Sequence, residues 1–143
     1  MRVRHLPIRV STGLLILDSG LNKRGADAET AQGLHGMAAG AYPFLADLEP
    51  QEFVRMLSRA EIVLGIALLL PFVPTFVVAL ALTAFSGGLV GMYLRTPALH
   101  KEGSIRPNQQ GLGIAKDLWM LGGALSMVLD LLTPRRTARS TAS

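Results

Sequence analysis

The stretch Ile62–Leu94, IVLGIALLLPFVPTFVVALALTAFSGGLVGMYL, decides the fold class. Its 33 residues include no Asp, Glu, Lys or Arg. About 20 apolar residues in a helix cross the roughly 30 Å of hydrocarbon in a bilayer. The whole chain of 143 residues is 50% hydrophobic and only 17% charged, against about 25% charged in a typical soluble domain. We therefore expect an integral membrane protein.

Two prolines divide this stretch. Pro71 and Pro74 predict a tight turn between two helices, and the alternative is one long helix kinked at both prolines. With a turn, the uncharged part before it is only Ile62–Leu70, about 14 Å long at 1.5 Å per residue. That length cannot span a bilayer, so the helix must extend back to about Phe53. This extension draws Glu61 into the membrane.

The complete pattern predicts an all-α fold, a four-helix transmembrane bundle with a polar interior. The bundle forms one membrane domain, residues 1–134, and residues 135–143 are expected to be a basic, disordered cytoplasmic tail. The expected helices are about 6–21, 53–70, 75–94 and 112–132.

An acidic segment connects the first two expected helices. Ala26–Glu52 contains no Lys or Arg. Within it, Thr30–Ala41 has Ala31, Leu34, Met37 and Ala38 on one helical face, which predicts a short amphipathic extracytoplasmic helix. A solvated acidic loop is the alternative.

Small residues recur along one face of the third expected helix. Gly87 and Gly91 form a GxxxG pattern. In lipid, glycines at this spacing let two helix backbones approach closely. We therefore expect Gly87 and Gly91 to pack against a neighbouring helix.

Six ionisable residues fall within or beside the expected spans. A charge at a helix centre costs about 2.5–3.5 kcal/mol on insertion scales, so these side chains should face inward and pair. We expect Lys116 to pair with Glu61 or Asp18, and Arg9 or Arg59 with a remaining carboxylate. The set forms either a polar ligand pocket or an ionic clamp that fixes helix packing, and the pattern leaves both open. The six residues are Arg9, Asp18, Arg59, Glu61, Lys116 and Asp117.

Several classes of site have no support in the sequence. There is no cysteine, which excludes disulfides and thiolate metal sites. No two of the three histidines share a helix at ligand spacing, and no known catalytic or phosphate-binding motif occurs. We therefore predict no catalytic residues and no metal. The net charge of +4 comes largely from basic chain ends, which suits the positive-inside rule better than nucleic-acid binding.

Three groups of residues together carry a family resemblance. They are Arg9…Gly13…Gly20…Lys23, then Glu61-x-x-x-Gly65 with Leu68-Leu69, then Lys116-Asp117. With these residues the chain resembles the DoxX family of small four-helix membrane proteins. The resemblance implies a multi-pass protein of the bacterial inner membrane with both termini in the cytoplasm.

The resemblance also implies a link to redox complexes, since the family is associated with a terminal quinol oxidase and with thiosulfate:quinone oxidoreduction. We expect a non-catalytic accessory or scaffold subunit of a membrane redox or oxidative-stress complex. Its partners would be the bilayer and membrane or extracytoplasmic proteins. The alternative is a quinone- or lipophile-binding subunit that uses Glu61, Lys116 and Asp117, with a quinone as its only cofactor. A small transporter is a third hypothesis.

Overall fold

The computed structural model describes residues 3–133, in which every regular element is a helix and no strand occurs. The expected all-α class is confirmed. The expected tail at 135–143 lies outside the described residues. The α-helices are α1 (Leu6–Lys23), α2 (Ala28–Ala41), α3 (Pro50–Leu69), α4 (Thr75–Arg95), α5 (Leu112–Ala115) and α6 (Asp117–Leu132). Short 3-10 helices occupy Val3–His5, Pro43–Leu45 and Pro97–Leu99.

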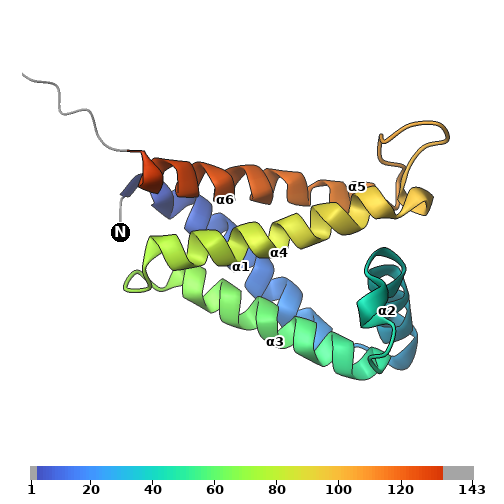
Figure 1. Cartoon of the computed structure of the whole chain (residues 1–143). Coiled ribbons are helices and arrows are strands. Elements are labelled where there is room, and N and C mark those ends of the chain that lie inside the picture. Colours follow the sequence, from blue (N-terminus) through green and yellow to red (C-terminus); the bar gives the residue numbers. More distant parts are fainter. Residues whose placement is uncertain (1–2, 134–143) are drawn as a thin grey trace, which may run out of the picture.

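Two antiparallel helix pairs form the body of the molecule (Figure 1). α1 packs mainly against α3, and α4 packs mainly against α6. α5 leads directly into α6, with Lys116 between them. α2 lies at one end of the body, where it contacts α3 and α4. The start of α1, the α3–α4 turn and the end of α6 lie at the opposite end (Figure 1).

The turn between α3 and α4 lies where the two prolines predict it. α3 ends at Leu69 and α4 begins at Thr75. Pro74 is the residue that immediately precedes α4, a place where its missing N–H costs no helical hydrogen bond. The alternative of a single helix kinked at Pro71 and Pro74 is wrong.

Glycines let α1 and α3 pack closely. A Cβ atom on Gly65 would lie 2.7 Å from the backbone nitrogen of Leu17, and one on Gly20 would lie 2.9 Å from that of Ile62. No real side chain tolerates such distances, so only glycine suits these positions. The Ser58 hydroxyl donates to the Gly20 carbonyl oxygen at 2.7 Å across the same interface. The tightest helix contact of the fold is therefore between α1 and α3.

The two glycines singled out in α4 have other neighbours. Gly91 faces the phenol of Tyr42, which donates to the carbonyl oxygen of Gly88 at 2.7 Å. A Cβ atom on Gly87 would meet only Leu121 of α6, at 4.0 Å. Gly91 thus makes room for a side chain from the α2–α3 connection, whereas Gly87 borders α6 loosely.

The acidic connection contains the short helix that its pattern predicts. α2 begins after Asp27, whose side chain accepts a hydrogen bond from the backbone N–H of Thr30 at 2.8 Å. This bond holds the pKa of Asp27 below its usual value. The expected apolar face is buried or partly buried, so the loop alternative is wrong. Its members are Ala31, Leu34, Met37 and Ala38.

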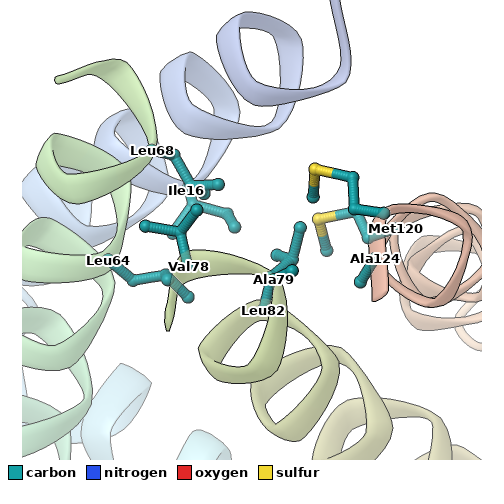
Figure 2. Packing of buried hydrophobic residues seen from close by; sticks show 9 residues of the cluster. Ile16, Leu64, Leu68, Val78, Ala79, Leu82, Met120 and Ala124 are labelled. Carbon is teal, nitrogen blue, oxygen red and sulfur yellow. The ribbon is translucent and has the colours of Figure 1, made fainter. Parts of the chain in front are cut away.

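The core lies where the two helix pairs meet, and Figure 2 shows its side chains. The outward faces are also apolar: Val63 of α3 is 67% exposed and Trp119 of α6 is 78% exposed. Within residues 3–133, two helical segments are long and apolar enough to cross a membrane. They are Thr75–Arg95, with a mean hydropathy of 1.9, and Leu112–Leu132, with a mean hydropathy of 1.4.

Candidate functional site

A cavity of about 550 Å³ lies between the two helix pairs, on the side of α2. α1, α2, α3, α4, α5 and α6 all contribute to its lining. Ligand pockets typically measure about 300–1,000 Å³ and combine apolar walls with a few polar groups. The apolar walls here include Met37, Phe53, Leu57, Phe85, Leu89 and Met92.

An ion pair between α1 and α3 forms part of the cavity wall. Lys23 Nζ donates to Glu61 Oε2 at 3.0 Å and to the Ser19 hydroxyl at 2.6 Å. Glu61 is only 4% exposed, and a buried carboxylate needs such a partner because an unpaired buried charge is strongly destabilising. Lys23 is also the last residue of α1, where a cation interacts favourably with the helix dipole.

The expected pairing of Glu61 with Lys116 is therefore wrong. Lys23 is the residue that pairs with Glu61. From the sequence, Lys23 was expected only to lie at the polar end of the first helix. Its spacing is the one available clue, because Lys23 follows Ser19 by four residues and so shares a helix face with it. Nothing in the sequence indicated that this face meets Glu61.

Asp117 brings a second carboxylate to the same cavity from the start of α6. It is partly buried and close enough to Glu61 and Lys23 to interact electrostatically with both. Within residues 3–133, no hydrogen bond or ion pair joins its carboxylate to another group. The cavity wall thus carries two carboxylates and one ammonium group.

Three other predicted site residues lie outside the cavity. Lys116 and Arg59 are exposed. Asp18 is also exposed and accepts a hydrogen bond from the side-chain amide of Asn22 at 3.1 Å. Successive residues on a helix point about 100° apart, and accordingly Asp117 lines the cavity while its neighbour Lys116 does not.

Arg9 is buried, with 1% exposure, but it binds backbone at the α3–α4 turn rather than a carboxylate. The expected carboxylate partner is wrong, because the last carbonyl groups of a helix lack partners within it and a guanidinium can satisfy several at once. Arg9 therefore closes the end of α3. Its acceptors, at 2.8–3.2 Å, are the carbonyl oxygens of Ala67, Leu68, Leu70 and Val73 and the hydroxyl of Thr75.

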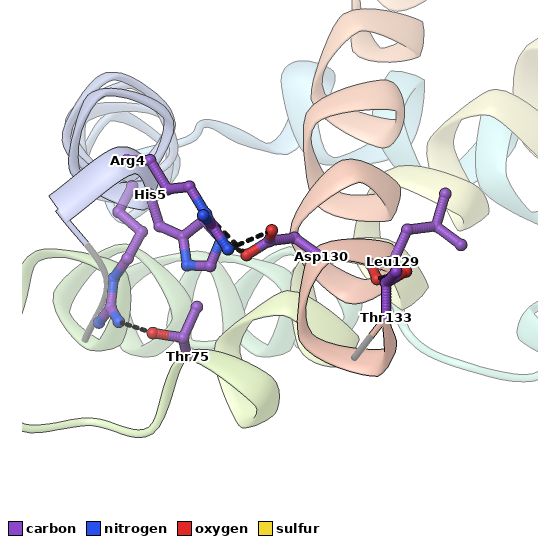
Figure 3. Close-up of polar contacts among 7 residues, drawn as sticks. Arg4, His5, Thr75, Leu129, Asp130 and Thr133 are labelled. Carbon is purple, nitrogen blue, oxygen red and sulfur yellow. Dashed lines mark hydrogen bonds and ion pairs between the residues drawn. The ribbon is translucent and has the colours of Figure 1, made fainter. Parts of the chain in front are cut away.

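A second polar cluster joins the start of the chain to the last turns of α6 (Figure 3). Asp130 forms an ion pair with Arg4 and contacts His5 Nε2 at 2.9 Å. His5 is only 4% exposed. Asp130 was not predicted as a site residue, and its one signal is its position as a carboxylate late in an apolar helix. This cluster fixes the chain start against α6 at the end of the molecule away from the cavity.

The cavity's chemistry suits binding. Its apolar walls can hold an apolar molecule, and Lys23, Glu61 and Asp117 can orient a polar group on it. Among residues 3–133, no three His, Asp or Glu side chains gather in a way that could hold a metal ion.

No family model matches the chain, and no curated protein or solved structure proves similar to it. The DoxX resemblance therefore rests on the sequence residues alone. Several of these residues share a location in the fold: Gly20 and Gly65 form the close α1–α3 contact, and Lys23, Glu61 and Asp117 line the cavity.

Proposed function

We propose that this chain is a small, DoxX-like integral membrane protein that binds a lipophilic small molecule in the cavity between its helix pairs. The cavity carries this proposal, since it combines about 550 Å³ of space with mostly apolar walls and a few charged groups. Of the hypotheses that the sequence raises, this one corresponds to the lipophile-binding subunit.

The distribution of apolar surface supports four crossing helices. The most apolar windows of α4 and α5–α6 are only 28% and 17% buried, whereas a core helix of a soluble protein is mostly buried. On α1 and α3, Leu14 and Val63 are exposed away from the cavity, whereas Arg9 and Glu61 are buried. Asp18 and Arg59 of the same helices are exposed. Buried charges and exposed apolar side chains suit a bilayer, and an exposed arginine can extend its charged end toward the interface. We place the protein in the bacterial inner membrane with both termini in the cytoplasm, as the resemblance implies.

A cavity-filling variant tests the proposed binding. Gly88 lines the cavity, and a Cβ atom there would have no neighbour within 4 Å. Gly88→Leu should therefore place its Cβ atom in the cavity without a clash and reduce the space left for a ligand. Gly122 of α6 also has an open Cβ position but does not line the cavity, so Gly122→Leu is the matched control.

The measurement is native mass spectrometry of protein purified in mild detergent. The wild type and Gly122→Leu should retain a small molecule acquired from the membrane, and Gly88→Leu should lose it. A wild type that carries no additional mass, or a Gly88→Leu variant that keeps it, contradicts the proposal.

An accessory-subunit role is the second candidate, and the surface around α2 favours it. Residues 26–52 contain no Lys or Arg, and their carboxylates are exposed, including Glu29, Asp47, Glu49 and Glu52. Such a surface suits a basic protein partner. Crosslinking in intact membranes should then give an adduct that disappears in a Glu49→Lys/Glu52→Lys variant. A chain that forms no adduct counts against this role.

A further inference from the structure

The charges that line the cavity do not balance. Glu61 and Asp117 each contribute −1 and Lys23 contributes +1, which leaves a formal excess of one negative charge. No other lining residue is an acid or a base of this kind; Tyr42 contributes a phenol, already bonded to Gly88. In apolar surroundings an excess charge is costly, so a proton or a cation must balance it.

The unmatched carboxylate belongs to Asp117. Lys23 is occupied by Glu61 and Ser19, at 3.0 and 2.6 Å. Glu61 in turn has its lysine. The Asp117 carboxylate has no hydrogen bond or ion pair to any residue in 3–133, and an ionised carboxylate can only accept. A ligand that supplies a positive charge beside Asp117 would complete the set.

We propose that the cavity binds a lipophilic cation, an apolar molecule with a single positive charge that lies against Asp117. This inference rests on the proposed lipophile-binding function and names the class of ligand. The apolar walls hold the body of the molecule, and Asp117 selects its charge. An anion of the same shape is rejected, because it would meet two carboxylates.

The cation competes with a proton for Asp117. The groups that face Asp117 across the cavity are Lys23 of α1, Glu61 of α3 and the phenol of Tyr42 from the α2–α3 connection, and α4 presents no ionisable side chain there. Raising the pH removes the competing proton, so affinity for the cation rises with pH. In Asp117→Asn this rise disappears.

Two probes of almost identical shape and opposite charge test the proposal. Tetraphenylphosphonium is a lipophilic cation and tetraphenylborate the corresponding anion. Isothermal titration of the full-length protein in dodecyl maltoside, with empty micelles subtracted, should show phosphonium binding at least tenfold tighter than borate binding. This comparison uses the wild type and does not depend on any variant folding. Equal affinities for the two probes, or no phosphonium binding, overturn the proposal.

Variants assign the selectivity to one side chain. Asp117→Asn should weaken phosphonium binding at least tenfold and leave borate binding unchanged or stronger. Asp18→Asn removes an exposed carboxylate outside the cavity and should change neither. If Asp117→Asn binds the phosphonium as tightly as the wild type does, Asp117 is not the residue that selects the cation.

The cavity-filling variant separates the two proposals. If Gly88→Leu abolishes the binding of both probes but the wild type binds them equally, lipophile binding stands and cation selectivity fails. If Gly88→Leu changes neither probe's affinity, the cavity is not their site and both proposals fail.

Discussion

Glu61 and Arg9 show how single residues are accommodated inside this bundle. Glu61 is buried against Lys23 of the neighbouring helix, and Arg9 is buried against backbone carbonyls at the end of α3. Both side chains connect α1 to α3, one near each end of the pair. Each therefore holds the pair together through polar contacts in addition to the glycine packing between them.

Removing one member of the Lys23–Glu61 pair should cost more than removing both. Lys23→Met leaves a carboxylate that is 4% exposed without its partner, and breaking such a pair costs about 3 kcal/mol. The double variant Lys23→Met/Glu61→Leu should lose much less stability. The stability of both variants is measured by unfolding them in mixed detergent micelles, with circular dichroism as the signal. Lys101→Met, which replaces an exposed lysine, is the control. Equal losses of stability in the single and double variants would contradict this account of the ion pair.

Replacing Arg9 by lysine should not preserve its function at the α3 terminus. Lysine keeps the charge but lacks the planar fork that lets one guanidinium reach five acceptors. We expect Arg9→Lys to lower the free energy of unfolding by about 2 kcal/mol, the value of a lost hydrogen bond from a charged group. The same unfolding assay applies, with the exposed Arg59→Lys as control. A stable Arg9→Lys variant would show that charge alone suffices.

Of the six ionisable residues expected to face inward, Arg9, Glu61 and Asp117 are buried or partly buried, whereas the other three are exposed. The exposed residues are Asp18, Arg59 and Lys116. The sequence predicted that Glu61 lies within a helix, because the nine uncharged residues before the α3–α4 turn are too few to cross a bilayer. The partners of these charged side chains depend on how each helix is rotated and shifted against its neighbour, which no local pattern encodes. Lys23 was missed as a site residue for that reason.

At the scale of elements, glycines set the distance between α1 and α3. Gly13, Gly20 and Gly65 all face the opposite helix at distances that exclude a Cβ atom or leave it little room. The prolines and the lengths of the apolar segments predicted where the helices begin and end. The glycine contact between α1 and α3 was not predicted. The more regular glycine pattern is Gly87-x-x-x-Gly91 in α4, whereas the glycines at the close helix contact are spread over α1 and α3.

Adding one methyl group at this contact should disrupt it. Gly65→Ala would place its Cβ atom 2.7 Å from the Leu17 backbone nitrogen, so the helices must separate, and overpacking of this kind costs about 1–3 kcal/mol. Gly122→Ala adds the same methyl group in open space and should be neutral or stabilising, because alanine favours the helix. Unfolding of both variants in the same micelles tests this. Equal stability of the two would mean that α1 and α3 do not pack this closely.

At the scale of the whole molecule, two close helix pairs border a cavity that neither pair forms alone. The sequence predicted four long helices and a polar interior, but the cavity depends on how the α1–α3 pair sits against α4 and α6, and on α2 at one end. Asp117 and Glu61 meet only through that arrangement. The central claim is therefore that all four long helices cross the membrane together.

Single-cysteine labelling tests this claim most directly, because the chain has no cysteine of its own. Phe72 in the α3–α4 turn is 77% exposed, and Phe44 and Ile105 in the connections at the other end are each 74% exposed. Each becomes a cysteine in turn, and a membrane-impermeant maleimide is added to spheroplasts or to inverted inner-membrane vesicles. We predict that Phe44→Cys and Ile105→Cys react in spheroplasts, whereas Phe72→Cys reacts only in inverted vesicles. Labelling of Phe44→Cys and Phe72→Cys from the same side would show that α3 does not cross the membrane and would contradict the account.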